Sequence, residues 1–311
     1  MSVIVPVMRF GDELDEAVAF YSQAFDHVTA EKLYHYPDDP EACEFLTEYP
    51  ELAGHTLGAK MRFGNCHLFF SHAPISIDDD ESISFIANFP GIDDPVITAR
   101  AQKTWENLCE GGEVILEFGS FAGGRSAGIV RDRFGVTWEI MNTIPDGKKR
   151  MFIVPSVAFG GKYQNQASEA VEFYSKVFPD HLIDQTLMYP EDDGLVTKNS
   201  ILFCAMEVNG QCFVFQDAGV PTEMPIRRST VFAIFCSNQE EIDTMRDALC
   251  ASEEPTGYPG VCTDPFGVNW LIVPENGASL AQDGPTMDKL WTSYGEWNRS
   301  TPPCSKQATA G

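Results

Sequence analysis

The same local pattern occurs twice in this chain, and this duplication constrains the fold more than any other feature of the sequence. Residues 17–25 read AVAFYSQAF, and residues 170–178 read AVEFYSKVF. A second matched pair follows in the same order, FGVTW at 134–138 and FGVNW at 266–270. Matched landmarks in a fixed order, at a spacing of domain size, indicate two copies of one module.

Each copy is predicted to contain the same succession of elements. An opening strand leads into an amphipathic helix, since Ala17, Phe20 and Tyr21 lie on one helical face together with the residues that continue the same spacing. A hairpin follows in each copy, with glycine and asparagine at its turn, as expected for a tight connection between alternating apolar runs. A further strand, helix and hairpin complete the copy.

We therefore predict an α+β protein with three regions. The first module covers residues 1–148, the second covers 149–276, and residues 277–311 form a polar tail. The tail carries aromatic residues at a spacing of three, which favours a short amphipathic helix docked on a module, with a partner-binding peptide as the alternative.

The charge of the chain excludes some classes of partner. The sequence has 21 Lys and Arg against 46 Asp and Glu, a formal net charge of −25 at pH 7. Such a charge repels phosphate backbones and anionic lipids, so we expect no nucleic acid and no membrane among the partners. The start of the chain lacks the pattern of a signal peptide, which favours a cytoplasmic protein.

The cysteines point to the same compartment. There are nine of them, an odd number, and no C-x-x-C pair occurs. Several lie within apolar runs, where a free thiol behaves as a small buried hydrophobe. We therefore predict reduced, mostly buried thiols and no zinc site.

The combined motifs resemble a known family. The AVxFYxxxF segment, the hairpins and the closing D-x-F-G-V-x-W, which begins at Asp132 and at Asp264, are similar to the PhnB-like branch of the vicinal-oxygen-chelate superfamily, the glyoxalase and bleomycin-resistance group. The resemblance implies paired βαβββ units that form curved mixed sheets with flanking helices. It also implies a cup that holds a small-molecule ligand, in a monomer or a homodimer.

The same resemblance implies where a metal would bind. Members that use a metal carry a glutamate four residues after the turn glycine, where this chain has Glu139 in the first module and Leu271 in the second. Histidine ligands have no clear counterpart, and His55, His67 and His72 are the only reserve. Because a metal centre needs three converging ligands, we predict no intact one. A divalent metal on Glu139 and these histidines is the alternative.

Other residues are candidates for contact with a ligand. Glu139 in an apolar cup would have a raised pKa and suit general base catalysis. Arg9 is predicted to face the same cup and to pair with Glu139 or an anionic ligand. Cys204, Trp138 and Trp270 are candidate ligand contacts, with packing in the core as the alternative. Strand alternation adds that Trp138 and Glu139 point to opposite faces.

Three hypotheses about function follow. The first is a small-molecule binding protein of this superfamily without a working metal centre. The second is a metal-dependent isomerase, lyase or dioxygenase-type enzyme that uses Glu139. The third is a non-catalytic interaction subunit. Some relatives carry the label 3-demethylubiquinone-9 3-methyltransferase, but no Gly-rich loop after a strand supports a cofactor of that kind.

Overall fold

The computed structural model describes residues 3–42, 44–72, 83–121, 125–148, 150–219, 221, 230–250 and 261–274. The predicted tail at 277–311 lies outside these ranges, as do Cys43 and Cys304. Within them, no helix is both long enough and apolar enough to cross a membrane.

The chain is built from four similar units, two in each predicted module. The first unit consists of β1 (Val3–Phe10), α1 (Leu14–Ala24), β2 (Val28–His35), the short helices η1 (Pro40–Ala42), α2 (Glu44–Glu48) and η2 (Pro50–Leu52), β3 (Thr56–Phe63) and β4 (Cys66–His72). The second consists of β5 (Ile83–Pro90), α3 (Pro95–Cys109), β6 (Glu113–Phe121), β7 (Arg125–Arg131) and β8 (Thr137–Thr143).

The second predicted module repeats this plan. Its first half, the third unit, contains β9 (Ile153–Phe159), η3 (Gly161–Tyr163), α4 (Ala167–Val177), β10 (His181–Met188), β11 (Ile201–Val208) and β12 (Gln211–Asp217). The fourth unit contains β13 (Thr230–Cys236), α5 (Gln239–Leu249), β14 (Val261–Thr263) and β15 (Asn269–Pro274). The prediction of tandem modules built from paired βαβββ units is confirmed.

The units pair across the two modules, so that neither sheet belongs to one module alone. Sheet A joins the first and fourth units in the order β14-β15-β13-β1-β4-β3-β2. Sheet B joins the third and second units in the order β10-β11-β12-β9-β5-β8-β7-β6. In both sheets two opening strands meet antiparallel at the centre, β1 with β13 and β9 with β5. The module boundary at residue 148 stays a prediction.

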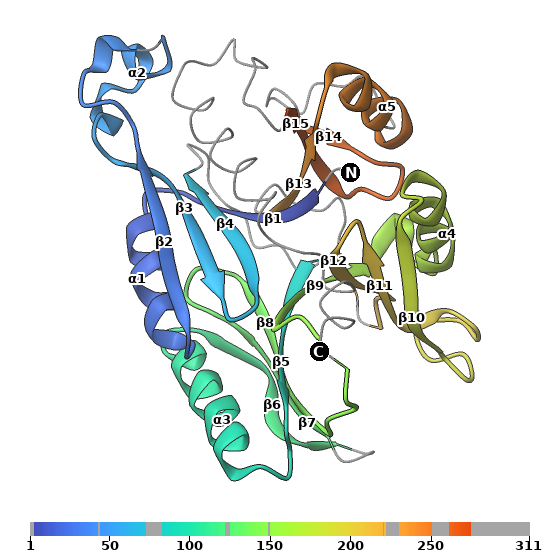
Figure 1. Ribbon diagram of the computed structural model, residues 1–311. Helices are drawn as coiled ribbons and strands as arrows, with labels where there is room; N and C mark the ends of the chain where they lie inside the picture. Colours follow the sequence, from blue (N-terminus) through green and yellow to red (C-terminus); the bar gives the residue numbers. More distant parts are fainter. Residues whose placement is uncertain are drawn as a thin grey trace.

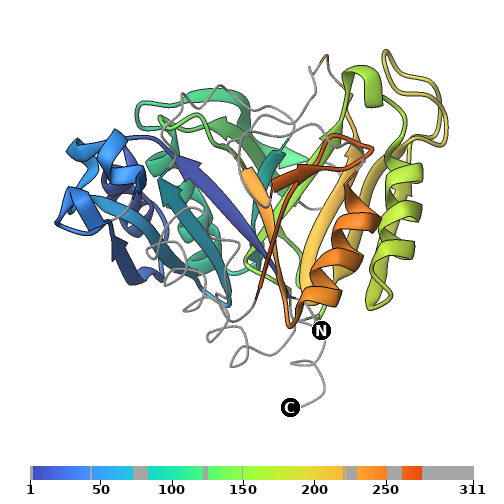
Figure 2. The same ribbon diagram turned by 90° about the horizontal axis from the view of Figure 1, so that it is seen from above.

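The four main helices, unlike the sheets, pair within each module. Helix α1 contacts α3, and α4 contacts α5. Figure 1 shows the first pair at the lower left and the second at the upper right, and Figure 2 shows α4 beside α5 from above. Their apolar stripes, which include Tyr21 and Tyr174, close one large core with the strands of both sheets. The predicted stripe on the first helix is confirmed by the burial of Ala17, Tyr21 and Ala24.

Each sheet also has an inner face, defined here as the face turned away from these four helices. On sheet A this face carries an apolar cluster centred on Val7, Phe69 and Leu271, and Leu46 of α2 and Leu52 of η2 pack against it. On sheet B the corresponding apolar cluster contains side chains from strands and from the chain before β9, and none from a described helix. The short helices α2 and η2 therefore contribute to the apolar cluster on the inner face of sheet A.

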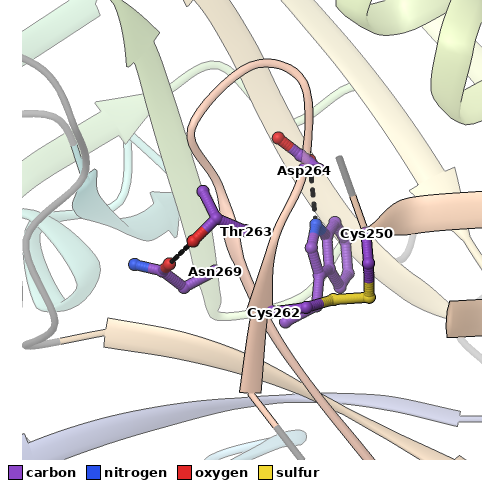
Figure 3. The surroundings of a disulfide bond; sticks show 6 residues. Cys250, Cys262, Thr263, Asp264 and Asn269 are labelled. Carbon is purple, nitrogen blue, oxygen red and sulfur yellow. Dashed lines mark hydrogen bonds between the residues drawn. A yellow bond between two sulfur atoms is a disulfide. The ribbon is translucent and has the colours of Figure 1, made fainter. Parts of the chain in front are cut away.

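One expectation about the cysteines is wrong. Cys250, at the end of α5, forms a disulfide with Cys262 of β14, and Figure 3 shows the bridge beside the final hairpin. The two cysteines are separated by 11 residues and form no C-x-x-C signature. The sequence analysis therefore did not recognise them as a pair. The other cysteines in the described ranges are free thiols: Cys66, Cys109, Cys204, Cys212 and Cys236.

Candidate functional site

Four polar side chains form a symmetric cluster at the centre of the inner face of sheet B. Ser84 of β5 and Ser156 of β9 are direct partners in the central antiparallel pair. Glu139 of β8 pairs with the residue two positions after Ser84, and Gln216 of β12 pairs with the residue two positions after Ser156. Glu139 and Gln216 therefore occupy equivalent positions on either side of the serines. We call these four residues the Glu139 cluster.

A continuous chain of hydrogen bonds joins the cluster. The Gln216 Nε2 atom donates to the Ser156 hydroxyl at 3.2 Å. The Ser84 hydroxyl donates to Glu139 Oε1, and Ser156 is the second side-chain partner of the same carboxyl group. Burial raises the pKa of Glu139, while the two serine hydroxyls act in the opposite direction by stabilising the carboxylate. The arrangement holds one carboxyl group in a fixed position, and its raised pKa makes it a stronger base than an exposed glutamate.

The surroundings of the cluster are apolar. Ile86, Val154 and Val214 are buried on the same face, and Met141, Phe203 and Cys212 pack against them while staying partly exposed. Glu139 and Gln216 are likewise partly exposed, whereas Ser156 is fully buried. The Glu139 cluster therefore combines one carboxyl group, an amide and hydroxyls, and apolar side chains surround it. Binding sites for small molecules have this composition.

Three of the four equivalent positions of sheet A carry apolar side chains. Val7 and Val231 are direct partners in its central pair and correspond to the two serines. Leu271 corresponds to Glu139, and Ser71 corresponds to Gln216. Leu271 is buried in the apolar cluster to which α2 and η2 also contribute. Of the two inner faces, that of sheet B carries a carboxyl group at this position, and that of sheet A does not.

The Glu139 cluster does not fit the divalent metal that the superfamily implies. Its donors are one carboxylate, two serine hydroxyls that already donate to that carboxylate, and an amide. Imidazole and carboxylate ligands, which such centres require, are missing from three of the four positions. Across the described ranges, no three His, Cys, Asp or Glu side chains gather closely enough to hold a metal ion.

The three reserve histidines lie in sheet A, away from Glu139. His67 of β4 lies 3.3 Å from Glu31, a carboxylate that also pairs with Lys60 and Arg62. Burial lowers the pKa of His67 to about 4. This pKa keeps the imidazole neutral, but its carboxylate neighbour Glu31 is already paired with two cations, Lys60 and Arg62, which would repel a metal ion.

His72 and His55 lie at the end of the same sheet. The His72 Nδ1 atom is 3.1 Å from the Tyr36 hydroxyl, its Nε2 is 3.7 Å from Asp12, and burial lowers its pKa. His55 accepts a backbone hydrogen bond from Tyr36 through its carbonyl and exposes its side chain. The structure therefore does not bring these histidines together with Glu139.

Arg9 and Glu139 belong to different sheets, so the prediction that they face one cup is wrong. Arg9 is on β1 of sheet A, opposite Ser71, whereas Glu139 is on β8 of sheet B. The reason is that each unit pairs with a unit of the other module. The first unit, which contains Arg9, and the second unit, which contains Glu139, therefore lie in different sheets.

The two tryptophans lie in the core between helices and sheets. Trp138 and Trp270 are buried, and each indole nitrogen donates to a buried aspartate at 2.9 Å, Asp132 and Asp264 respectively. The predicted alternation is confirmed, because Trp138 faces the helices while its neighbour Glu139 faces the opposite side. Both tryptophans therefore pack in the core, which was the alternative to ligand contact, and neither lies on an inner face.

Cys204 also lies on the helix side of its sheet. It is buried in the large core, and Thr186 contacts its sulfur at 3.5 Å. Burial raises the pKa of the Cys204 thiol, which keeps it protonated and unreactive. The cysteine of this sheet that packs on the inner face is Cys212.

Three members of the cluster, Ser84, Ser156 and Gln216, were not singled out by the sequence analysis. Ser156 is the polar residue of an otherwise apolar opening strand, and Ser84 occupies a similar strand of the second unit. An alignment of the four units with each other would have placed Ser84 at the position of Ser156, and Gln216 at the position of Glu139. Comparison of the two modules alone cannot do so, because the cluster combines different units of each.

Comparison with known proteins gives the class of the fold. Glyoxalase I from Zea mays aligns over 93% of this chain and 95% of its own, with a TM-score of 0.54 at 15% identity. A variant of that maize enzyme aligns over 93% of this chain and 96% of its own, with a TM-score of 0.52 at 16% identity. The paired sheets and this similarity define a protein of the glyoxalase fold.

One family model matches part of the chain, within the second module. Residues 152–273 match the family described as 3-demethylubiquinone-9 3-methyltransferase. A PhnB protein from Bacillus cereus covers 45% of this chain and 98% of its own at 15% identity, with a TM-score of 0.35. No curated protein matches the sequence. The chain therefore has the fold of glyoxalase I, and residues 152–273 match the 3-demethylubiquinone-9 3-methyltransferase family model, in line with the resemblance that the sequence motifs indicated.

Proposed function

We propose that this chain binds a small molecule on the inner face of sheet B, around Glu139, without a metal ion in the cluster. The observation that supports the proposal most directly is the hydrogen-bonded chain from Gln216 through Ser156 to Glu139. A polar network at the centre of an apolar sheet face costs free energy to bury, and a ligand that uses it would account for its presence.

A ligand screen tests this proposal. We would measure thermal stabilisation of the purified chain by a library of small molecules and repeat each hit on Glu139→Gln. The matched control is Glu207→Gln, a partly exposed carboxylate on β11 of the same sheet. Hits should stabilise the wild type and Glu207→Gln but not Glu139→Gln. Hits that stabilise all three proteins equally would place binding elsewhere.

Elemental analysis of the same protein tests the absence of a metal. We expect substoichiometric zinc, iron, nickel and manganese after purification without chelators. A full equivalent of any of these metals that disappears in Glu139→Ala would reverse the proposal. It would then favour a metal-dependent enzyme of the superfamily.

A second function, metal-free proton transfer, is favoured by the raised pKa of Glu139. A carboxylate with a raised pKa is a stronger base than an exposed one and suits proton abstraction from a bound substrate. The test is exchange of solvent deuterium into each confirmed ligand. Exchange that requires Glu139 would indicate an enzyme, whereas binding without exchange would leave the binding function. The methyl transfer named in the family description is not part of either proposal.

The cellular location belongs to the proposal as well. We propose a cytoplasmic protein, supported by the free thiols at Cys66, Cys204 and Cys236. The disulfide between Cys250 and Cys262 argues against a cytoplasmic location, because disulfides persist mainly in oxidising compartments. Fractionation of cells that express the chain, with trapping of free thiols before lysis, would decide between the two.

A further inference from the structure

The carboxyl group of Glu139 has no partner of opposite charge in the part of the chain that the structure describes. Its two side-chain partners are the uncharged hydroxyls of Ser84 and Ser156. Arg131, which lies opposite Thr137 on the neighbouring strand β7, pairs with Glu113 at 3.0 Å. A carboxylate withdrawn from water without a counter-charge is costly, and proteins usually pair such groups.

The carboxyl group also keeps room for further donors. A carboxylate offers about four acceptor positions, and the two serines use two of them. The serine hydroxyls approach from β5 and β9, the strands on one side of β8. Since Glu139 is partly exposed, its remaining acceptor positions are open to a group with more than one N–H bond.

A second polar atom near the cluster lacks a hydrogen-bond partner. The Thr137 side chain belongs to the same strand and, by alternation, to the same face as Glu139. Its residue is 8% exposed, and its hydroxyl oxygen makes no hydrogen bond. Two residues along a strand correspond to about 7 Å. The Thr137 hydroxyl is enclosed, so a head group bound at Glu139 would extend toward it rather than contact it directly.

The rest of the face suits the apolar part of such a ligand. Met141, Phe203 and Cys212 are partly exposed around the buried Ile86 and Val154. Methionine and phenylalanine adapt to flat or flexible apolar groups without loss of a polar contact. At long range, the net charge of −25 attracts cations toward the chain and repels anions.

We propose that the inner face of sheet B recognises a small molecule that carries a protonated amine or amidine on an apolar body, with Glu139 as its counter-charge. The inference rests on the proposed binding function and specifies the chemical class of the ligand. The equivalent position of sheet A cannot supply this counter-charge, because the apolar Leu271 is buried where Glu139 would be.

Three probes that differ only in their head group test the charge requirement. We would titrate 4-phenylbutylamine, 4-phenylbutanol and 4-phenylbutyrate into wild-type protein, Glu139→Gln and Glu207→Gln by calorimetry or by ligand-observed NMR. The amine should bind the wild type and Glu207→Gln at least tenfold more tightly than the alcohol. This preference should disappear in Glu139→Gln, and the butyrate should bind weakest to all three proteins. Circular dichroism of each variant confirms that it is folded.

The remaining outcomes would overturn the inference in distinguishable ways. Equal binding of amine and alcohol that depends on Glu139 would remove the cation requirement and leave the proposed binding function in place. An amine preference that survives Glu139→Gln would place the cation site elsewhere on the acidic surface. If none of the probes binds up to its solubility limit, and the wider screen also finds no ligand, both proposals fail.

Discussion

The Tyr174 hydroxyl donates a 2.7 Å hydrogen bond to Asp264, which lies 90 residues further along the chain. The first module repeats this contact between Tyr21 and Asp132. Each aspartate also accepts hydrogen bonds from two backbone amides of its own turn, at Phe266 and Val268 in the second module. The two repeated motifs of the sequence therefore meet in the core, where they hold the helix of one unit on the final hairpin of the next.

Loss of one of these contacts should destabilise the fold. Tyr174→Phe removes a donor from a fully buried carboxyl group, and hydrogen bonds to charged groups contribute about 1.5–3 kcal/mol. We expect the free energy of unfolding in urea to fall by about 2 kcal/mol. Tyr163→Phe, at a partly exposed tyrosine of η3, is the control and should change it by less than about 0.5 kcal/mol. Equal effects of the two variants would contradict this account.

The contribution of Asp264 to the free energy of unfolding should decrease as pH rises, whereas most carboxyl groups contribute more at higher pH. Burial raises its pKa to about 6, above the value of 3.8 expected when unfolded. The folded chain then binds more protons than the unfolded chain between these values. The contribution of this group is fully present below about pH 4 and is lost as pH rises through about 6.

Comparison of wild type with Asp264→Asn isolates this contribution. The advantage of the wild type in urea unfolding should shrink by a few kcal/mol between pH 4 and pH 7, since each pKa unit corresponds to about 1.4 kcal/mol. The exposed Asp247→Asn on α5 should give a curve parallel to that of the wild type. A constant difference between wild type and Asp264→Asn would show that the carboxyl group is not perturbed.

His67 should remain neutral at every physiological pH. Its pKa is lowered to about 4 by burial, while Glu31 raises it and Lys60 lowers it. NMR titration of the imidazole should therefore give a midpoint near 4. Glu31→Gln should move the midpoint further down, and Lys60→Gln should move it up. A midpoint near 6.5 in the wild type would mean that the side chain is not buried.

A carboxylate introduced on the inner face of sheet A should destabilise the fold, although sheet B carries Glu139 at the equivalent position. Leu271→Glu places an acid among the buried apolar residues of sheet A without the serines that surround Glu139. We expect this change to lower the free energy of unfolding by about 3 kcal/mol or more. Leu271→Met, which nearly conserves volume, should cost less than about 1.5 kcal/mol. A cost of the glutamate variant below that of methionine would show that water reaches this face.

The disulfide should contribute to stability through the short loop that it closes. Reduction of the bond between Cys250 and Cys262 should lower the free energy of unfolding by about 3 kcal/mol, as for loops of this size. The double variant Cys250→Ser, Cys262→Ser should show no response to reductant. Thiol titration of the denatured, unreduced chain should find two fewer thiols than its nine cysteines. A full count of nine would contradict the bridge.

The sequence by itself determined the local parts of this protein. Helical spacing predicted α1 and α4, turn residues predicted the hairpins, and the repeated motifs predicted two similar modules, while the family resemblance implied the paired units within each module. These features depend on residues close together in the chain, which is why they can be recognised without coordinates. Glu139 and its loss at Leu271 were also visible, because both follow a motif that fixes their strand position.

The tertiary structure alone decided which unit pairs with which. The opening strands β1, β5, β9 and β13 are all short apolar runs, so nothing local distinguishes one pairing from another. Strand pairing is a contact between distant segments, and it placed Ser84, Ser156 and Gln216 around Glu139 while it moved Arg9 into the other sheet. The bridge between Cys250 and Cys262 was decided in the same way, since it requires the two side chains to meet across an α5–β14 packing that no spacing rule encodes.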